Sequence, residues 1–260
     1  MKRISLLFIS FLFLHITASV DAQDGPLPTE DLINPRITLP NRVSAGIRIG
    51  ANIFSPLITH DPTDVYNSSP TGEFVPGFNA GLGATVAITN KISLFADVQL
   101  ISSTAKYLVE SGNFEDEFTE DLSLLSLPAG IKYQAVSGGM KFYPMLGIAF
   151  NYLMFSDFSY AYHPYPNESA SVESGGFDIT FERNRVHFNS VLGFGLQYQV
   201  KSLYLGFEIT YRHGLRNFID SDDMQTMQIY YGSSNPFKFQ SPGFRIHGIM
   251  VNLIIQKTGK

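Results

Sequence analysis

Residues 43–54 read VSAGIRIGANIF, and their apolar side chains recur at every second position. The odd positions from Val43 to Ile53 are all aliphatic, whereas the positions between them carry Ser, Gly, Arg and Asn. A helix would spread these apolar residues around its whole surface, but a strand places them on one face. The stretch therefore predicts a β-strand with one apolar and one polar face.

The same two-residue period returns seven more times toward the C-terminus. The further predicted strands cover 78–88, 92–103, 122–133, 140–155, 185–199, 202–213 and 244–256. Short connections fall near 89–91, 134–139 and 200–201, and long ones near 55–74, 104–121, 156–184 and 214–243. An even strand count with alternating short and long connections is typical of a transmembrane barrel whose short turns face the periplasm. The sequence thus predicts an all-β fold, an eight-stranded antiparallel up-and-down transmembrane β-barrel over residues 43–256.

The second face of these strands distinguishes a membrane barrel from a soluble one. A soluble barrel shows many charges to water, whereas here that face is rich in Gly, Ser, Asn and Gln and carries few charges. Of the 23 acidic residues, four precede the barrel and two lie in strands, which leaves 17 in the long connections beside four basic residues. A charge facing lipid is costly, so this distribution favours a barrel in a membrane.

The N-terminus has the pattern of a secretory signal peptide over residues 1–22. Lys2 and Arg3 precede an apolar stretch, and small residues at the −3 and −1 positions predict cleavage before Gln23. An uncleaved anchor is the alternative, but the apolar stretch is too short to span a bilayer. Residues 23–42 hold four prolines, which exclude the interior of a sheet. This segment is predicted to be a periplasmic lead-in or a plug.

Composition excludes several classes of function. The chain of 260 residues contains no cysteine, which rules out disulfides, thiolate zinc sites and a cysteine nucleophile. Its formal net charge of −5 argues against nucleic acid as a partner, because nucleic-acid binding needs basic patches.

Charged residues on the polar faces form the candidate site, a network of ion pairs in the lumen. Lone charges in so narrow an interior would be costly, whereas paired charges are tolerated. Counting along the strands predicts three residues near mid-height, two lower and two higher, near the outer rim. A hydrated pore with separated charges is the alternative arrangement. The predicted members of the network are Arg48, Asp97 and Glu208 at mid-height, Lys132 and Lys141 lower, and Arg212 higher, at the level where Arg245 is also expected.

No catalytic, cofactor or metal site is expected. His187 or His213 can be drawn with Ser190 or Asp157 at the outer rim, but no spacing supports a catalytic group, since such groups are recognised by geometry. No His-x-x-x-His or Glu-x-x-His pair occurs in a strand. Residues 220–223 read DSDD and lack the Gly and distal Glu of a calcium loop. They are predicted to be a solvated acidic tip.

Three stretches carry a resemblance to a known family. They are ISLFADVQL over 92–100, LSLPAGIKY over 125–133 and GFGLQY over 193–198. They resemble the outer-membrane β-barrel domain family of PorT-like small barrels in the cell envelope of Gram-negative bacteria, over roughly 43–256. The resemblance implies a place in the outer membrane and no shared catalytic residues, and it links some members to protein secretion.

Three classes of function remain open. The first is a non-enzymatic barrel with a structural or loop-mediated binding role at the cell surface. Its expected partners are outer-membrane lipid, lipopolysaccharide, or a surface or secretion-machinery protein. The second is a narrow channel for small solutes, and the third is a lipid-modifying enzyme. Single-channel conductance separates the first class from the second, and mass spectrometry of lipid A tests the third.

Overall fold

A computed structural model describes residues 43–60, 71–111, 114–137, 139–164, 173–218, 226–231, 235–240 and 243–258. The predicted signal peptide, the proline-rich lead-in and the acidic tip at 220–223 lie outside the described residues. No helix in the described part of the chain is long and apolar enough to cross a membrane.

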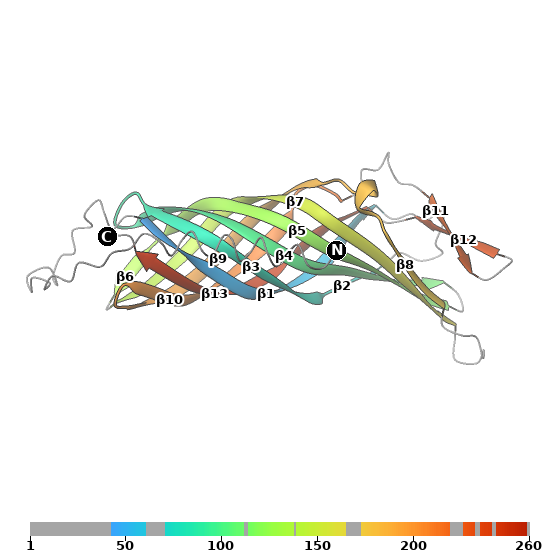
Figure 1. The fold of residues 1–260 in the computed structure, drawn as a ribbon, viewed down its shortest axis with the longest axis horizontal. Helices are drawn as coiled ribbons and strands as arrows, with labels where there is room; N and C mark the ends of the chain where they lie inside the picture. Colours follow the sequence, from blue (N-terminus) through green and yellow to red (C-terminus); the bar gives the residue numbers. More distant parts are fainter. Residues whose placement is uncertain are drawn as a thin grey trace, which may run out of the picture. The chain divides into compact units, whose positions relative to one another are not determined.

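Eight antiparallel strands close into a ring, which confirms the predicted eight-stranded barrel. Each strand pairs with its sequence neighbours in the ring, and the first strand pairs with the last (Figure 1). Closure gives every ring strand a hydrogen-bonded neighbour on both sides, as the lipid interior requires. The ring strands are β1 (Val43–His60), β3 (Val75–Ala87), β4 (Ile92–Ser111), β5 (Phe114–Tyr133), β7 (Met140–Pro164), β9 (Val186–Val200), β10 (Leu203–Gly214) and β13 (Gly243–Thr258).

Side chains alternate across the wall of the barrel as the sequence predicts. On β13, Leu253 is 68% exposed on the outside, while its neighbours Asn252 and Ile254 are buried in the lumen. On β1, Ile47 and Ile49 face outward and Arg48 faces inward, where it is 1% exposed. Apolar side chains that are exposed to this extent on every strand form the lipid-facing band.

Three strands run much further outward than the sequence pattern predicts. β4 and β5 pair up to Ser111 and Phe114, so most of the loop predicted at 104–121 is a hairpin extension. The predicted loop at 156–184 is also partly strand, because β7 continues to Pro164 and β8 (Glu173–Asp178) pairs with it. Charged residues such as Glu117 interrupt the apolar period here, yet a strand outside lipid can carry charge on its outer face.

The outer parts of these strands form one continuous sheet, which we call the outer wall. It consists of β2 (Thr71–Glu73), residues 104–111 of β4, 114–121 of β5, 156–164 of β7, and β8. Figure 1 shows these strands continuing past the ring together with β8. The smaller elements are β6 (Ala135–Ser137), the 3-10 turn η3 (Thr180–Glu182), and a separate hairpin of β11 (Thr226–Tyr231) and β12 (Asn235–Gln240).

A bulge on β7 reverses which positions face the lumen. Below it the odd residues Asn151 and Leu153 are buried, and above it the even residues Ser156 and Phe158 are buried. The register with β5 shifts by one residue at this point, between Leu153 and Phe155. An extra residue in one strand has this effect because side chains alternate with a period of two.

Candidate functional site in the barrel lumen

Glu208 on β10 is the centre of a buried cluster of charges. Its carboxylate accepts hydrogen bonds from Lys132 Nζ at 2.8 Å and Tyr143 Oη at 3.0 Å, and it also accepts one from Arg48 Nη1. Glu208 and Lys132 are each 2% exposed. A buried carboxylate with three charged or hydroxyl donors is held firmly in place, because each bond to an ionised group is stronger than a neutral one.

Arg48 connects this centre to a second carboxylate. Its Nε lies 3.2 Å from Asp97 Oδ2, and Gln99 Nε2 donates to the same oxygen at 3.3 Å. Gly83 faces this pair from β3, and a side-chain carbon there would collide with both Asp97 and the Arg48 guanidinium. The glycine therefore leaves the room that the ion pair occupies.

Lys132 also sits over two aromatic rings. Its Nζ lies 5.0 Å from the centroid of Phe95 and 4.5 Å from that of Tyr143. Ring faces attract a cation within about 6 Å. Tyr143 therefore contacts both members of the ion pair, through its ring to Lys132 and through its hydroxyl to Glu208.

The two remaining predicted members lie beside the cluster rather than in it. Arg212 is 3% exposed and donates to Ser126 Oγ at 2.8 Å and Gln99 Oε1 at 2.7 Å. Lys141 lies over the ring of Tyr204, 3.7 Å from its centroid. Among the described residues neither cation forms a salt bridge. The structure thus brings together Arg48, Asp97, Lys132 and Glu208, and it leaves Arg212 and Lys141 without a carboxylate.

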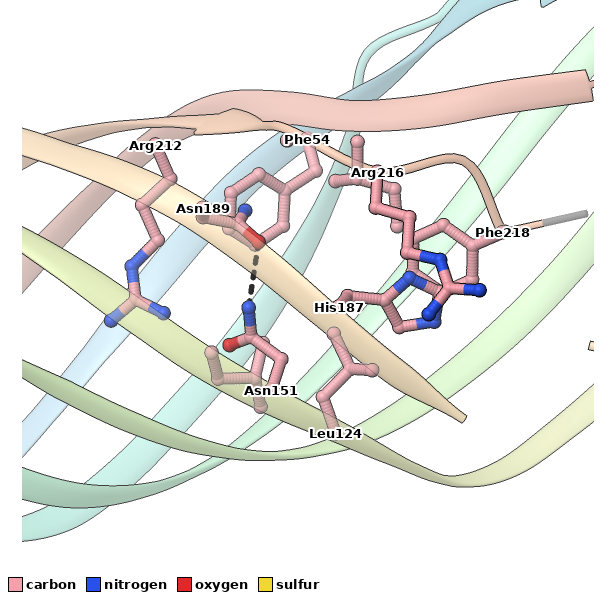
Figure 2. Close-up of a pocket in the computed structure, with 11 residues that line it drawn as sticks. Phe54, Leu124, Asn151, His187, Asn189, Arg212, Arg216 and Phe218 are labelled. Atoms are coloured by element: carbon pink, nitrogen blue, oxygen red, sulfur yellow. Dashed lines mark hydrogen bonds between the residues drawn. The ribbon is translucent and has the colours of Figure 1, made fainter. Parts of the chain in front are cut away.

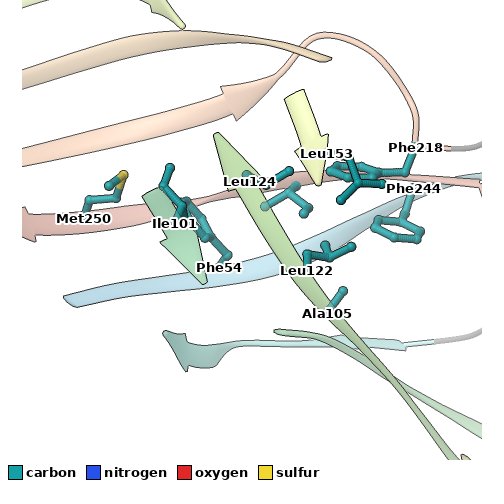
Figure 3. Packing of buried hydrophobic residues seen from close by; sticks show 10 residues of the cluster. Phe54, Ile101, Ala105, Leu122, Leu124, Leu153, Phe218, Phe244 and Met250 are labelled. Carbon is teal, nitrogen blue, oxygen red and sulfur yellow. The ribbon is translucent and has the colours of Figure 1, made fainter. Parts of the chain in front are cut away.

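The part of the lumen toward the outer wall is apolar, which the sequence pattern does not predict. Phe218 stacks on His187 with ring centroids 3.7 Å apart and on Phe244 at 5.2 Å. We call the buried group in Figure 3 the apolar plug. Inward apolar residues occur here because this stretch of lumen is filled by protein rather than by water. Its members are Phe54, Ile101, Ala105, Leu122, Leu124, Leu153, Phe218, Phe244, Ile246 and Met250.

A small cavity is lined by residues of the plug and by polar side chains beside it. Asn151 Nδ2 donates to Asn189 Oδ1 at 2.6 Å across it, and Arg212 and His187 also line it (Figure 2). The space open to the centre of a water molecule is about 10 Å³, which holds roughly one water. The lumen is therefore filled at two successive levels, one ionic and one apolar.

The sequence pattern does not predict a second buried ion pair, which lies in the outer wall. Arg183 donates from Nε and Nη2 to the two carboxylate oxygens of Glu120 at 2.8 and 2.9 Å, and Ser156 Oγ donates to the same carboxylate at 2.6 Å. Glu120 is 0% exposed. One feature of the sequence does indicate that Glu120 faces inward. Phe118, Glu120 and Leu122 alternate in a way that continues the inward face of β5 into the segment predicted to be a loop.

The residues considered for catalysis assemble only in part. His187 is buried in the lumen, whereas His213 lies on the outward face, opposite Ser190 on β9 and His247 on β13. Asp157 is exposed on the outer wall. Within the described residues, no three His, Asp or Glu side chains gather in a way that could hold a metal ion.

Residues 22–220 match the family model described as outer membrane protein beta-barrel domain. The chain belongs to this family. It is therefore a protein of the outer membrane of Gram-negative bacteria, as the sequence predicts. The narrower resemblance to PorT-like barrels and the signal peptide stay predictions. No curated protein is detectably similar in sequence.

Several solved outer-membrane proteins are similar to this chain at low sequence identity. The attachment invasion locus protein Ail of Yersinia pestis is 12% identical over 83% of this chain and 97% of its own, with a TM-score of 0.33. OprG of Pseudomonas aeruginosa is 10% identical over 83% and 93%, with a TM-score of 0.40. The protease OmpT of Escherichia coli is 9% identical over 85% and 97%, with a TM-score of 0.29. A shared barrel does not decide between binding, conduction and catalysis.

Proposed function

We propose that this member of the outer membrane protein beta-barrel domain family is a non-enzymatic barrel that does not conduct and that binds a protein partner through its outer wall. The observation that carries the first part is the filled lumen. Ions would have to pass the Arg48–Glu208–Lys132 cluster and then the apolar plug. An eight-stranded barrel is just wide enough for side chains to fill it, and an apolar constriction excludes hydrated ions.

The outer wall supports the second part of the proposal because it is an ordered, charged surface outside the lipid band. Its described outward side chains include Glu73, Glu117, Asp121 and Asp157. Lys106 lies among them, 3.0 Å from Glu73 and 3.2 Å from Glu117. The hydrogen bond to Glu73 is the main cause that raises the pKa of Lys106 above its ordinary value. The net negative charge of this face favours a partner with a basic surface.

A groove on the wall gives this partner a place to bind. It has a volume of about 350 Å³ and is lined by the strands β5, β7 and β8. Its side chains are mostly hydroxyl-bearing or acidic, and glycines expose the backbone at one edge. Such a lining suits a polar, cationic segment of a partner protein. The lining residues are Glu117, Thr119, Ser159, Tyr160, Ala161, Gly175 and Gly176.

Conductance of the purified full-length protein in planar bilayers tests the closed lumen. We expect no single-channel steps even in about 1 M salt, which is several-fold above the physiological ionic strength of roughly 0.15 M. A general porin reconstituted in the same way serves as the positive control. Reproducible steps of uniform size would favour the narrow channel over this proposal.

Photo-crosslinking in living cells tests the wall. A photoreactive residue at Thr119 should trap a protein, whereas one at the lipid-facing Leu205 should not. The Thr119 product should weaken when Glu117→Gln and Asp121→Asn remove two acidic groups beside the groove. A product that is unaffected by these changes, or altered lipid A masses that depend on the protein, would contradict the proposed binding role.

A further inference from the structure

Basic side chains gather at the outer end of the lipid band on one side of the barrel. The strands β9, β10 and β13 are neighbours in the ring, and their exposed apolar residues end near Phe188, Tyr211 and Ile249. Just beyond this level lie histidines and arginines, which we call the basic arc. His213 and His247 face each other across two paired strands. The members of the basic arc are Arg185, His213, Arg216, Arg245 and His247.

Two asparagines join the arginines of the arc into one unit. Arg216 Nη2 donates to Asn184 Oδ1 at 3.3 Å, and Arg245 Nε donates to Asn217 Oδ1 at 2.9 Å. Asn184 Nδ2 in turn donates to the backbone carbonyl of Asn217 at 3.2 Å. The guanidinium groups of Arg216 and Arg245 thus each donate to a neutral asparagine side chain, which fixes their positions.

Two described acidic residues, Asp178 and Glu182, lie beside the arc at η3. Among the described residues, neither Arg185 nor Arg245 forms a salt bridge. The carboxylate of Asp178 accepts hydrogen bonds from the hydroxyl and the backbone N–H of Thr180. These bonds are the main cause of the lowered pKa of Asp178, and the charge of Arg185 is a smaller one. Positive charge on β9, β10 and β13 therefore contrasts with the acidic outer wall on β4, β5 and β7.

An exposed aromatic side chain accompanies the arc. Phe181 in η3 is 89% exposed, and the Arg185 guanidinium carbon lies 5.0 Å from its ring centroid. Arg185 Nη1 also donates to Tyr152 Oη at 3.2 Å. An exposed ring beside a cation, just above an apolar band, fits a ligand that carries both an anionic group and acyl chains.

We infer that the basic arc binds the phosphate groups of a phosphorylated glycolipid of the outer leaflet. Arginine matches phosphate through its planar set of donors, and a lipid headgroup lies at the level where the apolar band ends. The acyl chains of the same molecule would lie along the exposed side chains of β9, β10 and β13. This site is separate from the groove of the proposed function, so either assignment can fail alone.

Binding of diphosphoryl lipid A to the purified full-length protein in detergent tests the arc. The double variant Arg185→Gln/Arg245→Gln removes two charges, and the double variant Lys201→Gln/Lys257→Gln removes two exposed charges at the opposite end of the barrel as a matched control. Each arginine near a charged lipid surface contributes about 1 kcal/mol, so the arc variant should bind roughly 30-fold more weakly. The control variant should bind as the unmodified protein does.

Three further arms identify the ligand chemistry. Dephosphorylated lipid A should bind the unmodified protein as weakly as diphosphoryl lipid A binds the arc variant. Inorganic phosphate should not displace the lipid, and a chelator should leave binding intact because the contact needs no bridging cation. Equal losses in the two double variants, tight binding without phosphate, displacement by free phosphate, or loss on chelation would each overturn the assignment. Unheated gel mobility checks that both variants fold.

Discussion

Lys132 and Glu208 lie 76 positions apart in the chain, yet Lys132 Nζ donates a 2.8 Å hydrogen bond to Glu208 Oε2 inside the barrel. Their strands, β5 and β10, are not neighbours in the ring, so the bond crosses the lumen. Both groups are removed from water, and their mutual attraction is needed to offset the loss of hydration.

Glu208→Ala should destabilise the barrel by about 3–5 kcal/mol, because it leaves Arg48 and Lys132 buried without their shared carboxylate. Arg212 should not be affected in this way, because it bonds to Ser126 and Gln99 and not to Glu208. Urea titration followed by unheated gel mobility measures the change, since the chain has no Trp for fluorescence.

Thr210→Ala is the matched control for this experiment. It alters a buried lumen side chain two positions away, whose hydroxyl has no partner among the described residues, so it should cost far less. An unaltered urea midpoint in Glu208→Ala, together with ion-selective conductance, would contradict the closed lumen and support a hydrated pore.

Arg183→Met should loosen the outer wall without unfolding the ring. It leaves Glu120 buried without its two guanidinium bonds, a local loss of about 3–5 kcal/mol. Limited proteolysis on intact cells should then cut the wall faster, while heat-dependent gel mobility stays normal. The double variant Glu120→Gln/Arg183→Met should recover part of the resistance.

Lys106→Met provides the comparison for the wall, because Lys106 forms an ion pair that is partly exposed. Removing an exposed pair changes stability by about 0.2–1 kcal/mol, so proteolysis should hardly change. Equal sensitivity of the Arg183 and Lys106 variants would mean that burial of the Glu120 pair has no special role.

Met250→Ala should destabilise the protein by about 2–5 kcal/mol, because Met250 is fully buried in the apolar plug. Conductance should stay absent, since the ionic level of the lumen is intact. Met140→Ala removes the same atoms from an exposed position and should have little effect. Channel opening in Met250→Ala alone would show that the plug is the sole barrier.

The unmodified protein should migrate faster on SDS gels before heating than after boiling. A closed ring has no unpaired strand edge at which detergent can begin to open it. Identical mobility in the two samples would contradict the barrel itself.

The period of two predicted the fold because lipid imposes it on every strand. Arg48 stands between Ile47 and Ile49, so its inward direction was readable from the sequence alone. The pattern failed where lipid no longer acts. Beyond the band both faces of a strand tolerate polar residues, so the sequence pattern predicts loops where the outer wall lies and does not indicate the Glu120–Arg183 pair.

The partners within the lumen were harder to predict than its members. Position along a strand gives height, but the tilt of the strands and the reach of a lysine decide which charges meet. Lys132 extends to Glu208, while Lys141 rests on Tyr204. No spacing in the sequence encodes the bulge between Leu153 and Phe155, which changes the inward face of β7 midway.

The pairing of β1 with β13 also sets the order of assembly. Of the eight ring strands, Val43–His60 is synthesised first and Gly243–Thr258 last, and the two pair along nearly their whole length. Until the final strand arrives, β1 and β10 each keep an edge of unsatisfied amides and carbonyls that the hydrocarbon layer does not tolerate. The ring therefore cannot close before β13 has been synthesised, and until then the earlier strands have to stay outside the hydrocarbon layer.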